Sequence, residues 1–221
     1  MRKAARLLGT LLLVAGVLTV AWVITVWRWQ DPFTAIYTHF EQEHLAHEYA
    51  DRAAAFRART GSDVAERHGY AAEAEAYGRS LRDGDPVGRI VIGRIGLSMI
   101  VVQGTDEASL RKGPGHYVAS GLPGEGRLIY IAGHRTTYLA PFSQINAIRI
   151  GDYIHLEMPY GDFTYRVVRH YVVPSTDLGV LRNVGHELLR LQACHPRFFA
   201  THRYIVDARL VAETPVRAAG T

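Results

Sequence analysis

The sequence is poor in cysteine, and Cys194 is the only one among 221 residues. A single thiol excludes an internal disulfide, and it serves either as a small buried side chain or as a reactive group. Paired zinc-ligand spacing is missing around Cys194, His195 and His202, so no metal or other cofactor is expected. Basic residues form no stripe and the formal net charge is only +4, so nucleic acid is not an expected partner. Internal repeats and low-complexity tracts are absent as well.

Charged residues are also missing from Leu7 to Trp27, directly after a short basic tip. At about 1.5 Å per residue, a helix over this run is about 30 Å long, which matches the hydrocarbon core of a membrane. A cleaved signal peptide is the alternative, but its apolar region is usually about 7–15 residues long and ends in small residues. Here the run ends in the bulky Trp27 and Trp29, which are suited to a membrane interface. We expect an uncleaved single-pass anchor, with the basic tip inside the cell and everything after Trp29 outside.

The region from residue 31 to about 85 is rich in alanine, glutamate and arginine, and aromatic side chains recur at helical spacing, as at Tyr49 and Phe56. A break follows Thr60, with Gly61 suited to end one helix and Ser62 to cap the next. We therefore expect two helices that act as a stalk and hold a domain off the membrane. A pair of partner-binding helices is the alternative.

From Pro86 onward, short runs rich in β-branched and aromatic residues alternate with turn residues. Strands are predicted at 89–92, 97–102, 128–132, 153–157 and 163–168 and on both sides of Cys194, with a hairpin turn at 159–162. Short helices are expected at 106–112 and 141–148. About eight strands at this spacing indicate an all-β domain, an eight-stranded barrel that is closed or nearly so.

Three residues at predicted strand ends are candidates for chemistry. Cys194 separates an apolar run from an alternating one, so we expect it at the end of a strand near solvent. His134 follows the buried strand 128–132 and one glycine, and Arg203 begins the last strand. A guanidinium there is suited to bind a substrate carbonyl or the oxyanion formed on attack. Each residue also has an ordinary structural explanation, and the residues alone leave both readings open.

The pattern around these residues resembles the sortases, which are cysteine transpeptidases of Gram-positive surfaces, and specifically class E sortases of actinobacteria. The resemblance covers roughly residues 86 to 212. The matching segments are Gly113-Pro114-Gly115-His116-Tyr117, Leu122-Pro123-Gly124, Ile131-Ala132-Gly133-His134-Arg135-Thr136-Thr137, Ala140-Pro141-Phe142, and Cys194-His195-Pro196 through Arg203-Tyr204-Ile205-Val206. It implies the sortase β-barrel, with His134, Cys194 and Arg203 as the catalytic set.

One departure from the family concerns the strand before the cysteine. Sortases usually carry Thr-Leu-x-Thr-Cys there, but Arg190 and Ala193 occupy the two threonine positions. Since the threonine preceding the cysteine is associated with substrate contact, Ala193 bears on substrate preference more than on chemistry. Ala193, His195 and Thr136 are the candidate substrate-binding residues.

The resemblance also implies a reaction and its partners. A surface protein with a C-terminal sorting signal, of the Leu-Ala-x-Thr-Gly or Leu-Pro-x-Thr-Gly type, is cleaved between Thr and Gly through a thioester, and an amine of a peptidoglycan precursor accepts the acyl group. We therefore divide the chain into a cytoplasmic tip and transmembrane anchor (1–29) in membrane lipid, a helical stalk (30–85), an extracellular catalytic domain (86–215) and a C-terminal tail (216–221).

The alternatives differ from this interpretation by specific features. An L,D-transpeptidase expects glycine immediately before its cysteine and arginine two residues after it, where this chain has Ala193 and Pro196. Papain-like enzymes place the cysteine before the histidine in the chain. A membrane-tethered domain that binds wall polymers without catalysis would show no thiol reactivity. A calcium-activated variant needs clustered acids in its loops, for which Asp177 and Glu187 are the only support.

Overall fold

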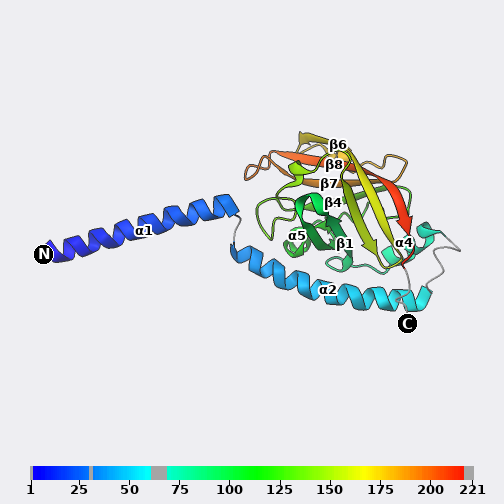
Figure 1. The fold of residues 1–221 in the computed structure, drawn as a ribbon, viewed down its shortest axis with the longest axis horizontal. Helices are drawn as coiled ribbons and strands as arrows, with labels where there is room; N and C mark the ends of the chain where they lie inside the picture. The colour runs from blue at the N-terminus through cyan, green and yellow to red at the C-terminus, as the bar shows by residue number, and fades with distance from the viewer. Residues whose placement is uncertain (1, 30–31, 61–68, 217–221) are drawn as a thin grey trace.

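The computed structural model describes residues 2–29, 32–60 and 69–216. Figure 1 shows a long N-terminal helix that extends away from a β-barrel and a second long helix that runs along one side of the barrel. The strands close into the barrel in the order β1-β2-β3-β4-β7-β8-β6-β5. The predicted eight-stranded all-β barrel is therefore confirmed.

The barrel wall consists mainly of antiparallel pairs, with two parallel pairs, β2 with β3 and β4 with β7. The strands are β1 (Pro86–Ile92), β2 (Leu97–Gln103), β3 (Gly115–His116), β4 (Leu128–Gly133), β5 (Tyr153–Met158), β6 (Gly161–Pro174), β7 (Leu188–His195) and β8 (His202–Thr214). The predicted hairpin is present, since β5 and β6 are joined by a tight turn. The sequence did not single out the two-residue β3, and β6 extends well beyond the predicted 163–168.

Strand β4 is buried on both of its faces, which explains its continuous apolar sequence. Ile129 and Ile131 belong to the main core inside the barrel. Tyr130 and Ala132 point the other way and join a second apolar cluster with Ile205 of β8 on the outside of the sheet. The outer face of β4, β7 and β8 is therefore covered by apolar side chains, and the candidate catalytic residues lie at the end of these three strands.

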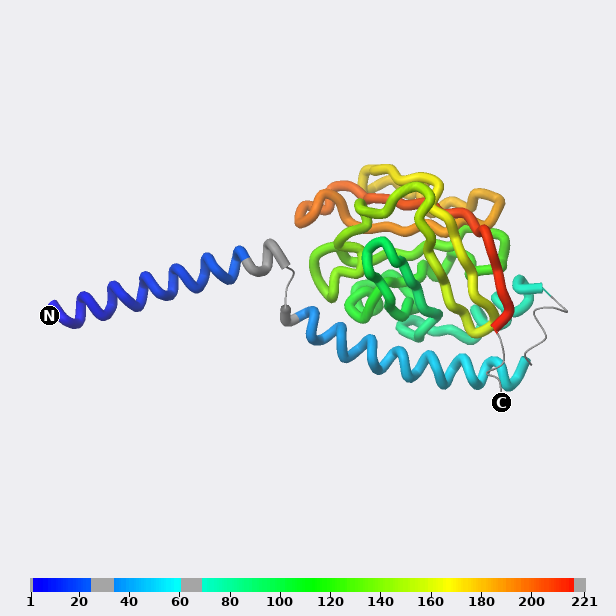
Figure 2. The backbone as a smooth tube through the Cα atoms, viewed as in Figure 1, coloured from blue at the N-terminus to red at the C-terminus, as the bar shows by residue number. Residues whose placement is uncertain are grey.

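Helix α1 (Arg2–Trp29) extends from the barrel without covering it, as the tube in Figure 2 shows. Its segment Arg2–Ile24 has a mean hydropathy of 2.5 and is long enough to cross a membrane, although a signal sequence meets the same criteria. The side chains of Trp27 and Trp29 lie outside the described residues.

Helix α2 (Pro32–Thr60) packs against the barrel along β1, β2 and α5. The Gln42 amide donates to the carbonyl oxygens of Ile100 (3.0 Å) and Lys112 (2.8 Å), and its oxygen accepts the N–H of Ile100 at 2.7 Å. Leu45 is buried against Ile100 and Val102. Within the segment predicted as a stalk, residues 32–60 are thus helical, and this helix forms part of the domain surface. A spacer role above a membrane stays a prediction.

Helix α4 (Tyr70–Gly78) follows the predicted break, but Gly61 and Ser62 lie outside the described residues. Its Tyr77 is fully buried in the main core and donates from its hydroxyl to the carbonyl of Pro86 at 3.0 Å. This contact ties the helical region to the first strand of the barrel. The C-terminal tail is described only at Val216.

Of the two short helices predicted from the sequence, one is present and the other is not. Helix α5 (Glu107–Lys112) is present where predicted and is capped by Asp106, whose carboxylate accepts the N–H groups of Ala108 and Ser109. The helix expected at 141–148 is wrong: this segment consists of turns with one 3₁₀ segment, η2 (Ile145–Ala147). The buried residues Phe142, Ile145 and Ile148 recur every third position, which fits 3₁₀ geometry better than an α-helix.

Candidate active site

The three candidate catalytic residues come from strands that are direct neighbours in the sheet. Gly133 of β4 is in register with Ala193 of β7, so His134 follows at the level of Cys194. Cys194 is in turn directly opposite Arg203 of β8. Opposed residues of an antiparallel pair have their Cβ atoms about 4.5–5.5 Å apart and on the same face of the sheet. The pairing therefore brings together three residues that are up to 69 positions apart in the sequence.

The face on which these residues lie follows from strand alternation. Ala193 is fully buried in the main core, so its neighbour Cys194 projects from the outer face of the sheet. Gln192 shares this outer face and hydrogen-bonds the hydroxyl of Tyr130 on β4. Cys194 is partly exposed and forms no disulfide. A thiol in this position is accessible to a peptide lying across the outer face, at the end of the apolar cluster on β4 and β8.

His134 has an environment that disfavours its charged form. Its ring lies 5.2 Å from the ring of Tyr138, and its Nε2 atom is buried without a hydrogen-bond partner among the described residues. Burial lowers the pKa of His134 below its ordinary value, Glu107 opposes this shift, and Arg111 adds to it. The neutral imidazole is therefore the ground state near neutral pH, with one ring nitrogen left for a proton transfer.

The loop that carries His134 has an unusual backbone. Tyr138, Leu139 and Ala140 all have positive φ angles, of 54°, 56° and 39°. Such angles in residues other than glycine cost of order 1–3 kcal/mol each and persist where the surrounding structure holds them. The N–H of Tyr138 donates to Thr34 Oγ1 of α2 at 3.0 Å. Helix α2 thus takes part directly in shaping the His134 loop.

Gly133 allows this loop to pack close to the sheet. A Cβ atom at Gly133 would lie 2.6 Å from the ring of Phe142, which is fully buried. The N–H of Phe142 donates to the carbonyl of His134 at 3.0 Å. The glycine before His134 is therefore required by packing, which the sequence alone did not reveal.

Arg203 is held by the turn between β7 and β8. Its Nη1 atom donates to the carbonyl oxygens of Ala200 (2.8 Å) and His202 (2.9 Å). Arg197, the other arginine near the cysteine, lies within the turn with its guanidinium 5.6 Å from the ring of Phe198. The register places Arg203, not Arg197, opposite the thiol.

The family of this chain follows from comparison with known proteins. The model of the sortase domain matches residues 90–211, which is more than half of the chain. The chain belongs to the sortase family. Members of this family are cysteine transpeptidases, which agrees with a cysteine at the end of β7.

Named relatives include sortases D and E. Sortase D of Bacillus subtilis is 34% identical over 133 residues, covering 58% of this chain and 65% of the relative. Sortase SrtE1 of Streptomyces coelicolor is 30% identical over 115 residues, covering 46% of this chain and 33% of the relative. This sortase thus spans about two thirds and one third of the length of these two proteins.

Solved structures show the same fold. Sortase E from Streptomyces avermitilis has a TM-score of 0.57 and 32% identity, covering 63% of this chain and 97% of that one. The Clostridium perfringens sortase D5 transpeptidase has a TM-score of 0.58 and 26% identity, covering 64% of this chain and 88% of that one. The resemblance to class E inferred from the sequence is consistent with these matches, although a sortase D is among them as well.

The candidate substrate-binding residues differ in how they are placed. Ala193 of this sortase is completely buried, so a contribution to binding would have to come from its main chain. The ring nitrogen Nδ1 of His195 lies 2.8 Å from Nη1 of Arg135, and Thr136 is partly exposed in the His134 loop. Substrate contact by these three residues stays a prediction. Arg135 itself was not singled out by the sequence, although it directly follows His134.

Arg190, at the other position where sortases usually carry threonine, has a structural partner. It is buried and forms a bidentate pair with Asp207 of β8, at 2.6 and 3.0 Å, and donates to the carbonyl of Val180 at 2.7 Å. Arg169 of β6 also contacts Asp207 at 2.7 Å. A planar guanidinium can bridge a carboxylate and a carbonyl in this way, whereas a threonine cannot. The departure at Arg190 thus ties β7 to β8 and to η3 (Leu178–Leu181).

The acidic residues considered for calcium have other roles in this sortase. The Glu187 carboxylate accepts N–H groups of Gly124 and Gly126 and the hydroxyl of Tyr165. Asp177 accepts the N–H of Gly179 at the start of η3. Within residues 2–29, 32–60 and 69–216, no three histidine, cysteine or acidic side chains are grouped as metal ligands.

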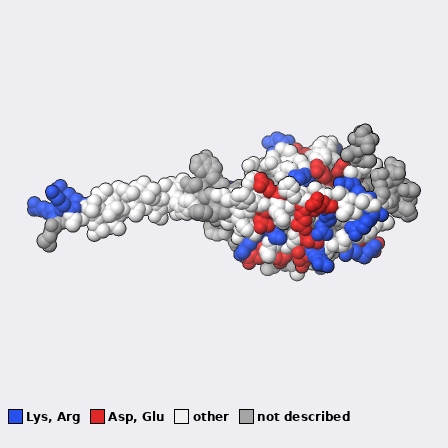
Figure 3. Space-filling model, turned by 90° about the horizontal axis from the view of Figure 1, so that it is seen from below, with Lys and Arg blue, Asp and Glu red and all other residues white. Residues whose placement is uncertain are grey.

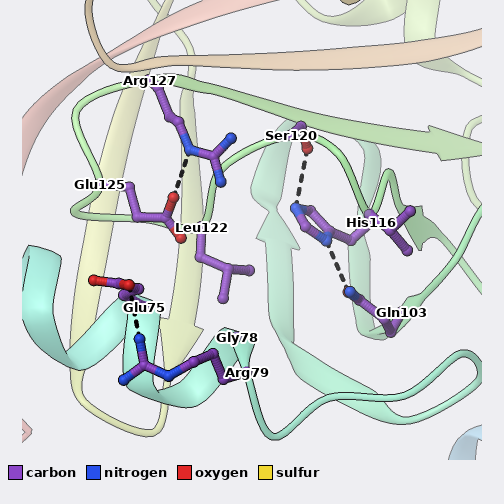
Figure 4. Close-up of a pocket in the computed structure, with 10 residues that line it drawn as sticks. Glu75, Gly78, Arg79, Gln103, His116, Ser120, Leu122, Glu125 and Arg127 are labelled. Carbon is purple, nitrogen blue, oxygen red and sulfur yellow. Dashed lines mark hydrogen bonds and ion pairs between the residues drawn. The ribbon is translucent and has the colours of Figure 1, made fainter.

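A separate pocket of about 240 Å³ lies between α4 and the loop that precedes β4 (Figure 4). His116 is buried at its wall, with Nδ1 2.8 Å from Gln103 Oε1 and Nε2 2.8 Å from the carbonyl of Gly121. Burial lowers the pKa of His116 to about 4, so this histidine is neutral at physiological pH. The charged residues of the pocket pair with each other, Glu125 with Arg127 and Glu75 with Arg79. The pocket therefore offers no free charge to a ligand.

Proposed function

We propose that this chain is a membrane-anchored cysteine transpeptidase that cleaves a sorting signal of the Leu-Ala-x-Thr-Gly or Leu-Pro-x-Thr-Gly type and transfers the acyl group to an amine of a cell-wall precursor. The observation that carries the proposal is the register of β4, β7 and β8, which aligns His134, Cys194 and Arg203 at one end of the outer sheet face. The family match supports the same reaction class.

The first half of the reaction forms a thioester. The Cys194 thiolate attacks the carbonyl carbon of the Thr–Gly bond, and the oxyanion that develops is stabilised by the Arg203 guanidinium. This guanidinium is already oriented by two carbonyl oxygens and needs little reorganisation. His134 carries the proton lost by the Cys194 thiol and gives it to the leaving amine as the C–N bond breaks.

The second half of the reaction releases the enzyme. Neutral His134 accepts a proton from the incoming amine, which attacks the thioester carbon and restores the Cys194 thiolate. Because both steps are acyl transfers, the energy of the original peptide bond is retained in the product. No nucleotide is therefore needed outside the cell.

Helix α1 supplies the anchor. Figure 3 shows basic side chains at the N-terminal tip, followed by a long surface without charge. Leucine and valine side chains along this helix are exposed, which is unfavourable in water and suits lipid. The basic tip then lies on the cytoplasmic side and the barrel outside. Protease treatment of intact cells should remove the barrel, and the membrane-bound form should keep an N-terminus at or next to Met1. A mature N-terminus beyond Trp27 would contradict the anchor.

The activity is tested with the full chain in detergent micelles. Mass spectrometry after incubation with libraries of Leu-Pro-x-Thr-Gly and Leu-Ala-x-Thr-Gly peptides should detect an acyl-enzyme on Cys194 and reveal the preferred signal. Cys194→Ala serves as the control and should form no adduct. Absence of any acyl-enzyme or transfer product with both libraries, in a folded protein, would contradict the proposed function.

A further inference from the structure

The turn between β7 and β8 carries an exposed apolar pair. Phe198 is 52% exposed and Phe199 is 76% exposed. Within residues 69–216 they are the only two consecutive large apolar side chains that are both exposed. The other phenylalanines of the barrel, Phe142 and Phe163, are fully buried in the main core. Single exposed apolar side chains are ordinary on a protein surface, whereas an exposed aromatic pair suggests a contact with another apolar body.

A second exposed apolar group lies at the start of α2. Ile36 and Phe40 are 58% and 65% exposed, and their spacing of four residues places them on one face of the helix. Thr34 lies two residues before Ile36 and therefore on the opposite side of α2. Its Oγ1 atom accepts the N–H of Tyr138 in the His134 loop. The exposed face of α2 is thus held in a defined position beside the active-site loop.

Both groups lie at the end of the molecule from which α1 extends. In Figure 2 the orange turn before β8 and the blue start of α2 are at this end, and α2 runs away from it along the barrel. The connection is short, since only residues 30 and 31 separate α1 from α2. A chain from Trp29 to Pro32 covers at most about 11 Å, even when it is fully extended.

The length of α1 places this end of the molecule close to lipid. The apolar span ends at Ile24, and α1 continues to Trp29, which is about 7–8 Å further at about 1.5 Å per residue. One headgroup layer of a bilayer is about 5–8 Å deep. When α1 spans the membrane, α2 therefore begins at the outer edge of the headgroups or just above it.

The charge of both segments suits an anionic lipid surface. The sequence has no acidic residue in 32–40 or in 188–206, so no carboxylate of these segments repels lipid phosphates. Arg197 lies within the turn, with its guanidinium 5.6 Å from the ring of Phe198. Aromatic side chains with a basic neighbour are typical of protein segments that rest in the headgroup region.

We propose that Phe198 and Phe199, together with Ile36 and Phe40, form a membrane-docking surface that enters the headgroup region of the bilayer that holds α1. This second contact fixes the orientation of the barrel, which α1 and its short connection alone do not. The Cys194 end of β7 is then held at the membrane surface, within reach of substrates that are held in the same bilayer. The inference rests on the proposed role of α1 as an anchor and does not depend on the proposed reaction.

The test measures the depth of the β7–β8 turn in the full chain, reconstituted in vesicles of phosphatidylcholine and phosphatidylglycerol. Thr201→Cys in a Cys194→Ala background provides a single exposed thiol beside the turn for a nitrobenzoxadiazole fluorophore. Lipids that carry a nitroxide at the headgroup or the upper acyl chain quench this fluorophore on contact. Glu213→Cys in the same background is the matched control, about 35 Å away along β8 at about 3.3 Å per residue. The label at 201 should be quenched, and the label at 213 should not.

Replacement of the aromatic pair tests which side chains make the contact. Phe198→Ser combined with Phe199→Ser should remove most of the quenching of the label at 201, because two large apolar side chains no longer enter the bilayer. Val211→Ser also replaces an exposed apolar side chain, but near the far end of β8, and should leave the quenching unchanged. Thermal unfolding checks that each variant is folded.

Flotation of the vesicles separates the anchor from the membrane-docking surface. A chain that does not float with the vesicles contradicts the anchor and this inference with it. A chain that floats refutes the docking surface alone if the label at 201 is quenched no more than the label at 213, or if the double phenylalanine variant keeps the quenching. In the parent cysteine background, slower acyl-enzyme formation in that variant, together with an unquenched label at 201, would assign the turn to substrate contact instead. Quenching between labels of neighbouring chains, without quenching by lipid, would assign it to a second copy of this chain.

Discussion

Replacement of Gln42 by alanine tests whether helix α2 is an integral part of the catalytic domain. The Gln42 amide makes three hydrogen bonds to the main chain of Ile100 and Lys112. It is also enclosed, because a methyl group added at Gly113 would collide with it. Each hydrogen bond contributes about 1 kcal/mol net, and Gln42→Ala leaves main-chain groups of β2 and α5 without this partner.

The expected loss is about 2–3 kcal/mol of the free energy of unfolding, since the site is only partly buried. For a domain of this size, each kcal/mol corresponds to about 2–4 °C in Tm, so Gln42→Ala should lower Tm by about 5–10 °C. Differential scanning fluorimetry of the full chain in detergent, supported by urea unfolding, measures this change. His44→Ala, at an exposed position of the same helix, is the matched control and should shift Tm by less than about 2 °C.

The result also bears on the active site. Since Thr34 of α2 accepts the N–H of Tyr138, loosening the helix should slow acylation of Cys194 as well as lower Tm. A Tm for Gln42→Ala within about 1 °C of the parent would mean that α2 is only loosely associated with the barrel, and the reasoning from these hydrogen bonds would be refuted.

The remaining predictions concern the catalytic set. Arg203→Ala should lower turnover by about 10²–10³, the loss found when one oxyanion donor is removed. Arg197→Ala should lower turnover far less. Equal losses for the two variants in a peptide-cleavage assay would show that Arg203 is not the residue that stabilises the oxyanion. Tyr138→Ala should let water reach His134 and so raise the pKa of this histidine, which burial now lowers. The acidic limb of the pH–rate profile should then move to higher pH. An unmoved limb would show that Tyr138 does not control the burial of His134.

The sequence alone determined the class of the fold and the identity of the catalytic candidates. Strand periodicity and turn residues depend on local geometry, so they predicted an all-β barrel and the β5–β6 hairpin, which the structure confirms. A single cysteine, a histidine after a buried strand and an arginine at the start of the last strand are likewise visible without a structure. The long apolar run before residue 30 is a property of composition, and it corresponds to helix α1.

Tertiary structure decided what depends on contacts between distant segments. Helical periodicity in α2 could not show that Gln42 bonds to β2 and α5, because nothing local to the helix records which surface it meets. The segment 141–148 has helical composition, but the packing of Phe142 over Gly133 makes it a chain of turns. Arg135 looks like an ordinary loop arginine in the sequence, and its buried contact with the main-chain carbonyl of Cys194 arises only when β4 and β7 pair in parallel. Periodicity reports which side of an element is apolar, whereas the partner that covers that side is chosen by the packing of the whole chain.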